Sequence, residues 1–302
     1  MILNLTADKT DIRLDAFISS QNSDYTRSYF TNLINDGRVT VNGKTAKKAG
    51  LKLREGDKVE VDMPAPVSTD ARPEDIPLDV VYEDDDLIII NKPQGMVVHP
   101  AAGHYEGTLV NALLAHCEGN LSDINGVIRP GIVHRIDKDT SGLMIAVKNN
   151  ETHIKLAEMM AAHEIERQYR ALVYGVVSAD KGTIDAPIGR AGSDRRKMVV
   201  TEDGKPSITH FEVVNRYTEL TDLKLILETG RTHQIRAHMT YIGHPVAGDP
   251  LYAPKRKKYG LTGQCLHSKS IRFIHPRTGE ELYFETELPE YYKNVLESLI
   301  ML

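Results

Sequence analysis

A polar turn between two short apolar stretches is the feature that most constrains this chain. Residues 132–133 begin as an apolar strand, the chain then turns through polar residues, and Leu143–Val147 resumes as a second strand. The turn holds one acid, Asp137, between Arg135 and Lys138. A carboxylate on a loop between two buried strands is well fixed, and neighbouring cations favour its ionised, nucleophilic form. The same pattern also fits a turn Asp that hydrogen-bonds its own backbone.

The whole string from His134 to Gly142, His-Arg-Ile-Asp-Lys-Asp-Thr-Ser-Gly, resembles the signature loop of the RluA/RluD-type pseudouridine synthases. These enzymes isomerise uridine in structured RNA. Ile136 stands where that family usually has leucine, a conservative departure. The resemblance implies that Asp137 is the catalytic carboxylate and that Arg135 reaches into the base stack when the target nucleotide is extruded. Asp139 is a rival by proximity alone, with turn stabilisation as its default role.

The 302 residues are enough for two unequal domains. Residues 12–62 combine two short helical patterns with short alternating strands and turn signals. The diagnostic strings are Arg13-Leu14-Asp15, Arg27-Ser28, Val39-Thr40-Val41-Asn42-Gly43 and Gly56-Asp57. Together they resemble the compact RNA-binding domain named after ribosomal protein S4. Residues 63–75 have the proline and small-residue content of a linker. The catalytic domain would span 76–302, and the Asn-Lys-Pro-Gln-Gly string at 91–95 resembles its entry segment in the same family.

Basic residues recur through the small N-terminal unit. Any one of them alone is a solvated surface charge, but a set on one face binds a phosphate backbone. We therefore predict RNA contacts from Arg13, Arg27, Arg38 and Lys44.

The net charge of −5 is unusual for an RNA-binding protein, but the acidity is concentrated in one stretch. Residues 63–90 carry 1 basic and 8 acidic residues, a net of −7. Residues 1–62 carry 10 and 9, and residues 91–302 carry 26 and 25. The parts expected to face RNA are therefore balanced, with local basic clusters.

The pattern of the larger part predicts an α+β fold. Leu87–Ile90, with four bulky apolar residues in a row, suits a strand buried on both faces. Strands dominate and helices are few, which favours a mixed or largely antiparallel sheet. The family resemblance adds that the sheet is long and bent, with the active-site cleft across its middle. Helices are expected at 108–117 and 151–163, and strands at 169–177, 209–217, 223–229, 264–273 and 282–286.

Two further strings resemble motifs of the same family. Tyr169 lies in the string at 166–173, and the resemblance implies that it lines the pocket against the target base, where stacking and proton abstraction are both open to it. The string at 230–239 follows a strand and opens a helix, whose N-terminus offers backbone N–H groups. The resemblance implies that Arg236 pairs with the catalytic Asp. Arg231, five residues earlier, is better interpreted as a backbone or phosphate contact.

The chemistry and the composition predict a protein without metal or cofactor. Isomerising uridine neither oxidises, reduces nor adds a group, so no cofactor is expected. The spacing of His233, His238 and His244 does not match the i, i+4 pair of a helical zinc site, so no metal is expected. There is no apolar run of about 18 residues and no signal-peptide pattern at the start. With only two cysteines, we expect a cytoplasmic protein with reduced thiols. We also expect a monomer that does not contact membranes.

These observations predict an RNA pseudouridine synthase acting on uridine in large-subunit ribosomal RNA. The alternative is a non-catalytic RNA-binding or ribosome-assembly factor on the same fold, but such a protein would not need Asp137, Tyr169 and Arg236 together. A nucleosidase or glycosidase is a further rival. Such enzymes usually use paired acids, whereas the signature loop supplies a single motif acid.

Overall fold

The computed structural model describes residues 2–21, 25, 27–63, 71–100, 105–124, 130–192 and 194–302. Thr26, a candidate N-cap of the second helix by residue type, lies outside these residues, as does most of the expected linker. One hydrophobic core is built from residues between Ala7 and Met63, and three further clusters are built from residues beyond position 77. The N-terminal core shares no residue with the other three.

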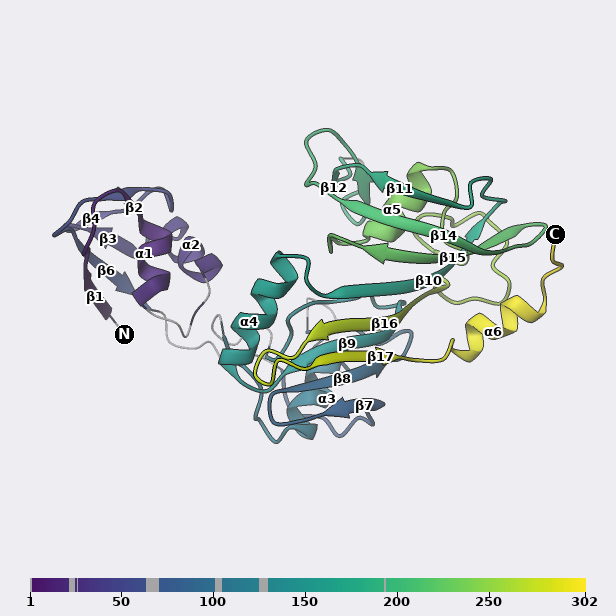
Figure 1. Cartoon of the computed structure of the whole chain (residues 1–302), viewed down its shortest axis with the longest axis horizontal. Coiled ribbons are helices and arrows are strands. Elements are labelled where there is room, and N and C mark those ends of the chain that lie inside the picture. The colour runs from purple at the N-terminus through teal and green to yellow at the C-terminus, as the bar shows by residue number, and fades with distance from the viewer. Residues whose placement is uncertain are drawn as a thin grey trace.

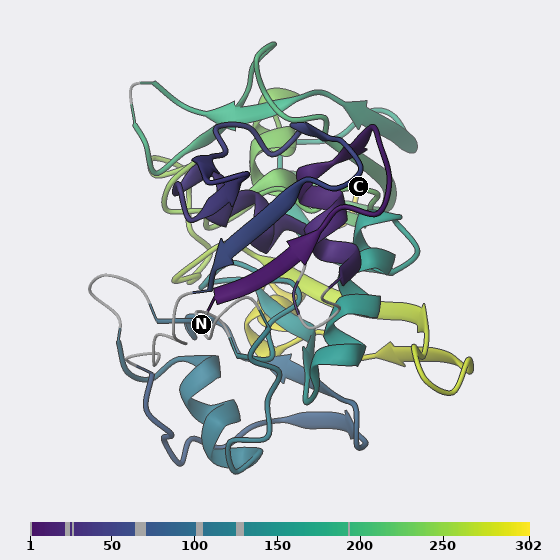
Figure 2. The same ribbon diagram turned by 90° about the vertical axis from the view of Figure 1, so that its left-hand side faces the viewer.

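The N-terminal unit is a small antiparallel sheet with two helices. The sheet order is β1 (Ile2–Thr6), β6 (Lys58–Asp62), β3 (Val39–Val41) and β4 (Lys44–Thr45). The long strands β1 and β6 run side by side (Figures 1 and 2). The apolar pattern of the first expected helix starts at Ile12, but the helix itself begins at Leu14, because residues 12–13 form β2 and pair with β5. The remaining elements are β2 (Ile12–Arg13), α1 (Leu14–Gln21), α2 (Arg27–Asn35) and β5 (Lys52–Leu53).

The larger part is built on a nine-stranded mixed sheet, as predicted (Figure 1). Eight strands follow one path and β17 (Glu281–Glu285) joins the side of β16. A separate two-stranded hairpin is formed by β12 (Ile188–Arg190) and β13 (Met198–Val200). The path runs β11 (Lys181–Asp185), β14 (Ile208–Arg216), β15 (Leu220–Leu227), β10 (Glu166–Tyr174), β16 (Leu266–Ile274), β9 (Ser141–Val147), β8 (Leu87–Lys92) and β7 (Val80–Glu83).

Helices cover both faces of this sheet, which explains the apolar run in β8. Ile88 and Ile90 join the cluster that contains residues of α3 (Leu109–His116) and α5 (Gln234–Tyr241). Leu87 and Ile89 point the other way, into the cluster that contains Leu156 of α4 (Asn150–Ala161). The predicted double burial of this strand is therefore confirmed. The C-terminal helix α6 (Glu290–Glu297) packs on a fourth cluster, and no helix in the described part of the chain is long and apolar enough to cross a membrane.

The sheet changes partners in its middle, at β16. Strands β9 and β16 are parallel and pair at only two positions, Ser141 with His267 and Gly142 with Ser268. Beyond Ser268 the same edge of β16 pairs with β17 instead. The two halves of the sheet therefore meet at a short parallel seam directly after the signature loop.

The expected strand at residues 132–133 is wrong. Ile132 makes a single isolated bridge to Ala146, and the strand after the loop begins at Ser141. The physical reason is a side chain: His134 Nε2 accepts the N–H of Ile145 at 2.9 Å, taking the donor that a neighbouring strand would have used. Other expected helices and strands are present, shifted by up to three residues at their ends.

Gly142 holds the parallel seam together by lacking a side chain. Its φ is 109°, and a Cβ there would lie 2.2 Å from the carbonyl oxygen of Ser268 and 2.6 Å from its nitrogen. We expect Gly142→Ala to lower the free energy of unfolding by more than about 3 kcal/mol, because the backbone of β16 must move. Gly279→Ala is the matched control: its φ is also positive, at 74°, but a Cβ would meet nothing within 4 Å, so about 1–2 kcal/mol is expected. Equal losses in urea unfolding would contradict this account.

Candidate active site

A cleft of about 600 Å³ lies where the signature loop, α4 and the segment leading into α5 approach one another. Its walls come from the signature loop, the end of α4, the start of β10 and the segment leading into α5. Asp137, Tyr169 and Arg236, three residues far apart in the sequence, all line it, as do Arg135 and Arg231. The cleft therefore gathers the predicted catalytic set and two of the predicted RNA-binding arginines.

The centre of the site is one guanidinium shared by two carboxylates. Arg236 Nη1 donates to Asp137 Oδ2 at 2.8 Å. The other edge of the fork meets Asp249, with Nε to Oδ2 at 2.7 Å and Nη2 to Oδ1 at 3.0 Å. Burial opposes the charge of Arg236, but the two carboxylates outweigh it and raise its pKa further above its usual value. The Asp137–Arg236 pairing implied by the family resemblance is thus present in the geometry.

Asp249 is placed by its own turn. Its Oδ1 accepts the backbone N–H groups of Leu251 at 2.9 Å and Tyr252 at 3.0 Å, the pattern of an Asx turn. The Asp249 side chain is fully enclosed, whereas that of Asp137 is 18% exposed. Asp249 therefore orients Arg236 from behind, while Asp137 is the carboxylate that reaches the cleft.

Tyr252 braces the same group from the side. Its hydroxyl exchanges hydrogen bonds with both backbone groups of Met198 in β13, at 2.8 and 2.9 Å. The guanidinium of Arg236 lies 5.0 Å from the centre of its ring, within cation–π range. The hydroxyl also lies 3.1 Å from Nδ1 of His233, a residue in the left-handed conformation at the start of α5. The β12–β13 hairpin is in this way tied to the active site.

The entry string at 91–95 is hydrogen-bonded to the backbone of the signature loop. Lys92 is fully buried, and its ammonium donates to the carbonyls of Pro93, Met96 and Lys138 at 2.8 to 3.0 Å. Burial lowers the pKa of Lys92 to about 7, while three carbonyl acceptors match the three N–H groups of the charged form. Gly95 adds a backbone bond to the carbonyl of Lys138 at 2.9 Å. These bonds fix the residue that follows Asp137.

Tyr169 lies on β10 with 5% of its surface exposed. Burial raises the pKa of its phenol, so the ring stays protonated near neutral pH. A register shift between Gln168 and Tyr169 in the pairing with β16 sets where the ring meets the cleft. The side chain is therefore a rigid, neutral wall of the site.

The comparison with known proteins decides the family. The family model described as RNA pseudouridylate synthase matches residues 86–241, and the S4 domain model matches residues 12–59. The chain belongs to the RNA pseudouridylate synthase family. It is 52% identical to the RNA pseudouridine synthase YlyB of Bacillus subtilis, over 95% of this chain and 94% of that protein. It is 42% identical to the ribosomal large subunit pseudouridine synthase D of Zymomonas mobilis, over 99% and 97% of the two chains.

A solved structure supports the same fold. Human RNA pseudouridylate synthase domain containing 1 aligns with a TM-score of 0.61 at 23% identity, over 74% of this chain and 89% of that one. The predicted α+β fold is thus confirmed. The family model and the similar proteins confirm the enzyme class: this pseudouridine synthase is an isomerase.

The arginines predicted in the S4 domain of this pseudouridine synthase are already engaged in ion pairs. Arg13 and Arg27 both bind the buried carboxylate of Asp15, each at 3.0 Å, and Arg38 lies 2.8 Å from Asp62. About half of the Arg13 and Arg27 side chains stays exposed. Arg13 also lines a shallow groove with Lys47 and Lys48, while Lys44 lies exposed on β4. Their contact with RNA stays a prediction.

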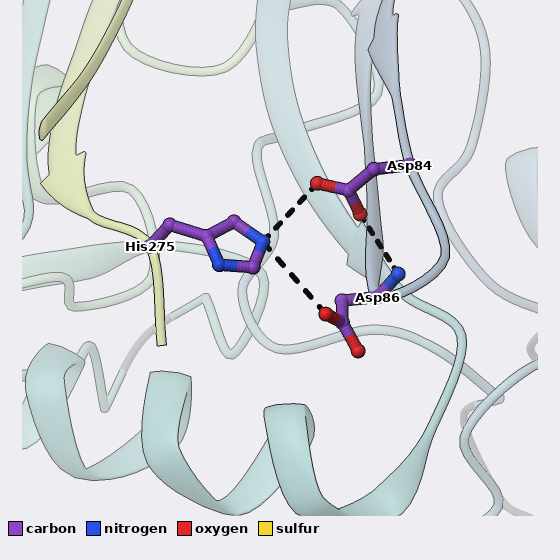
Figure 3. A group of neighbouring side chains, drawn as sticks. All are labelled: Asp84, Asp86 and His275. Carbon is purple, nitrogen blue, oxygen red and sulfur yellow. Dashed lines mark hydrogen bonds and ion pairs between the residues drawn. The ribbon is translucent and has the colours of Figure 1, made fainter. Parts of the chain in front are cut away.

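A second polar cluster lies away from the cleft, where the β7–β8 turn meets the end of β16 (Figure 3). Asp84, Asp86 and His275 are the group in the described residues whose composition and spacing suit a metal. His275 Nδ1 accepts the backbone N–H groups of Arg277 and Thr278, each at 3.1 Å, so the ring proton sits on Nε2. That nitrogen lies 3.1 Å from Oδ2 of Asp84 without making a hydrogen bond to it, and Arg277 pairs with Asp86. These contacts link the β7–β8 turn to the residues that follow β16.

The three histidines weighed as metal ligands are separated in the structure. His238 bonds Thr209 and the carbonyl of Ala186, both at 2.9 Å. His244 bonds the carbonyl of Tyr174 at 2.9 Å, and His233 faces Asp137 at 3.8 Å. Each ring therefore has its own contacts, and the expectation of no metal stays a prediction.

Asp249, Tyr252 and Arg167 are site residues that the sequence reasoning missed. The string Gly248-Asp249-Pro250 is a turn signal and could have drawn attention to Asp249. No local pattern marks Tyr252, whose partners are 16 and 54 positions away. Arg167 lies in the string at 166–173, two residues before Tyr169.

His134 of the signature loop should remain uncharged across the neutral range. Burial and the nearby Arg167 charge lower its pKa to about 3, from an ordinary value of 6.5. The unfolded chain takes up this proton as the pH falls below about 6.5 and the folded protein does not, so this site lowers stability between pH 6.5 and 3. We expect His134→Gln to make the free energy of unfolding less steep in that window, by up to about 1.4 kcal/mol per pH unit. A ring resonance of His134 titrating near pH 6.5 would contradict this.

Proposed function

We propose that this pseudouridine synthase isomerises uridine in large-subunit ribosomal RNA, with Asp137 as the reacting carboxylate. The observation that carries the proposal is the placement of Asp137 in the cleft, with its Oδ2 held 2.8 Å from the Nη1 of Arg236. Relatives that share 40–42% identity over nearly the whole chain are named ribosomal large subunit pseudouridine synthase D. The S4 match supports an RNA ligand of the same kind.

The reaction breaks the bond between C1′ of ribose and N1 of uracil and forms a bond from C1′ to C5. The C5 proton is then lost and N1 gains one, so the overall change is an isomerisation. Asp137 supplies the nucleophilic or charge-stabilising carboxylate. Arg236 supplies the counter-charge to that carboxylate and fixes its direction, because the guanidinium is itself held by Asp249. Attack on the base and attack on the sugar are both compatible with this arrangement.

Tyr169 packs against the target base in this proposal. Its enclosed ring and raised pKa favour stacking over proton abstraction, because the phenolate is rare at neutral pH. Arg135 is exposed where it lines the cleft and enters the stack as the nucleotide is extruded. Arg231, exposed beside the start of α5, contacts a phosphate.

We further propose a division of labour between two domains. The S4-type unit at 12–62 adds affinity through Arg13, Arg27, Arg38 and Lys44, residues 63–75 tether it, and residues 76–302 carry the chemistry. The separate hydrophobic cores support independent folding. The protein acts as a cytoplasmic monomer.

The carboxylate assignment is tested in cells and in vitro. Asp137→Asn keeps shape and polarity but removes the charge, so turnover should fall at least about 100-fold, equal to about 2.7 kcal/mol of transition-state stabilisation. RNA affinity should stay within a few-fold. Asp139→Asn is the matched control two residues away and should remain active. Mapping pseudouridines in ribosomal RNA from a strain lacking the protein, then complemented with each variant, gives the readout. Restoration by Asp137→Asn would exclude the role given to Asp137, and an unchanged map in the strain lacking the protein would exclude ribosomal RNA as its target.

The domain proposal predicts an active truncated protein. A chain that begins at Asp70 should still isomerise uridine in a short RNA, because the whole cleft lies beyond that point. On long ribosomal RNA its KM should rise, since the tethered second contact is lost. The slope of log K against log salt should become shallower by about 0.7–0.9 for each lost phosphate contact. A folded but inactive truncation would show that the S4-type unit helps build the active site.

A further inference from the structure

Arg167 is a buried cation to which the described part of the chain offers no partner. It lies near the start of β10, lines the cleft and has 6% of its surface exposed. Its Nε is enclosed without an acceptor, and the guanidinium makes no hydrogen bond or ion pair with any residue the structure describes. Arg236, the other buried arginine in those residues, has two carboxylates. An unpaired buried charge is costly, so a protein retains one where an anion from outside completes it.

The surroundings of Arg167 leave room for an incoming group and offer no protein anion. Of the described residues that line the cleft, Asp137 is the only acid, and Arg236 already binds it. Four arginines line the same cleft. A Cβ at Gly230 would lie 2.8 Å from Nη1 of Arg167, so the glycine gives the guanidinium its place against the turn before α5.

His134 supplies a second donor beside this arginine. Its Nε2 accepts the N–H of Ile145, which leaves the ring proton on Nδ1. Nδ1 has no acceptor among the described residues, and both side chains line one cleft. A neutral imidazole donates a hydrogen bond without adding charge, and the guanidinium offers a planar fork that matches two oxygens of one phosphate.

We infer that Arg167, assisted by Nδ1–H of His134, binds a phosphodiester group of the RNA strand next to the target uridine. This rests on the proposed action on RNA and deepens it. A phosphate is favoured over a uracil carbonyl, because only an anion compensates the charge of the buried guanidinium. The group is either the 5′ or the 3′ phosphate of the target nucleotide.

The test combines protein and RNA changes in a cycle. A short RNA substrate carries one uncharged methylphosphonate, either 5′ or 3′ of the target uridine, and binding is measured by fluorescence anisotropy. We expect Arg167→Met to weaken binding of the unmodified RNA about tenfold. One of the two methylphosphonates should weaken wild-type binding similarly and have no further effect on Arg167→Met, which identifies the linkage. The salt slope of the variant should be shallower by about 0.7–0.9.

Arg272→Met is the matched control, because Arg272 is an exposed arginine on β16 whose Nη1 lies 3.6 Å from Glu281. Its effect should add to that of either methylphosphonate. Arg167→Met should keep or raise the melting temperature, since removing an unpaired buried charge relieves the folded state. A lowered melting temperature would assign Arg167 a structural role and overturn the inference.

Additive effects at both linkages would also overturn it. A fall in kcat with intact binding would assign the arginine to the base instead. Pseudouridine formation by the wild-type protein on the unmodified RNA is scored separately, so failure of the proposed function is distinguished from failure of this subsite.

Discussion

The active site depends on the guanidinium of Arg236, which is fixed by more hydrogen bonds than the carboxylate of Asp137 with which it pairs. Arg236 makes two bonds to the enclosed Asp249 and one to Asp137, and Tyr252 covers its face. Because Asp249 is fixed by its own turn, the direction of the third bond is set before substrate arrives. The site is therefore preorganised around its cation, and the orientation of Asp137 follows from it.

The signature loop is held from two sides by different means. On one side, the ammonium of Lys92 donates hydrogen bonds to three backbone carbonyls, including that of Lys138. Behind, the ring of His134 replaces a strand partner for Ile145. In both cases a side chain stands where regular structure would use backbone. The loop therefore departs from the sheet while these backbone C=O and N–H groups keep hydrogen-bond partners. Such loops carry catalytic groups on a rigid scaffold.

Sequence patterns predicted a feature correctly where it depends on local residues, or where a family motif implies a contact between distant residues. The apolar run in β8 predicted its double burial, and the motif strings predicted that Asp137 and Arg236 meet. The strand expected at 132–133 was wrong, because propensity does not reveal that a histidine takes the available N–H group. Asp249 and Tyr252 depend on tertiary contacts that no local pattern encodes. The lack of a partner for Arg167 among the described residues depends on its neighbours in space. The sequence shows only its neighbours along the chain.

The short parallel seam between β9 and β16 has a mechanical consequence. Asp137 precedes β9 in one half of the sheet, whereas Tyr169 and Arg236 belong to the other half, and the strands between them share two residue pairs. Neighbouring pairs such as β8–β9 and β10–β15 share six and seven. Backbone pairing therefore joins the two halves over fewer residues than it joins the strands within each half, and side-chain bonds such as that between Ser141 Oγ and His267 Nδ1, at 2.8 Å, complete the joint. A change in the angle between the halves would alter the separation between Asp137 and Arg236.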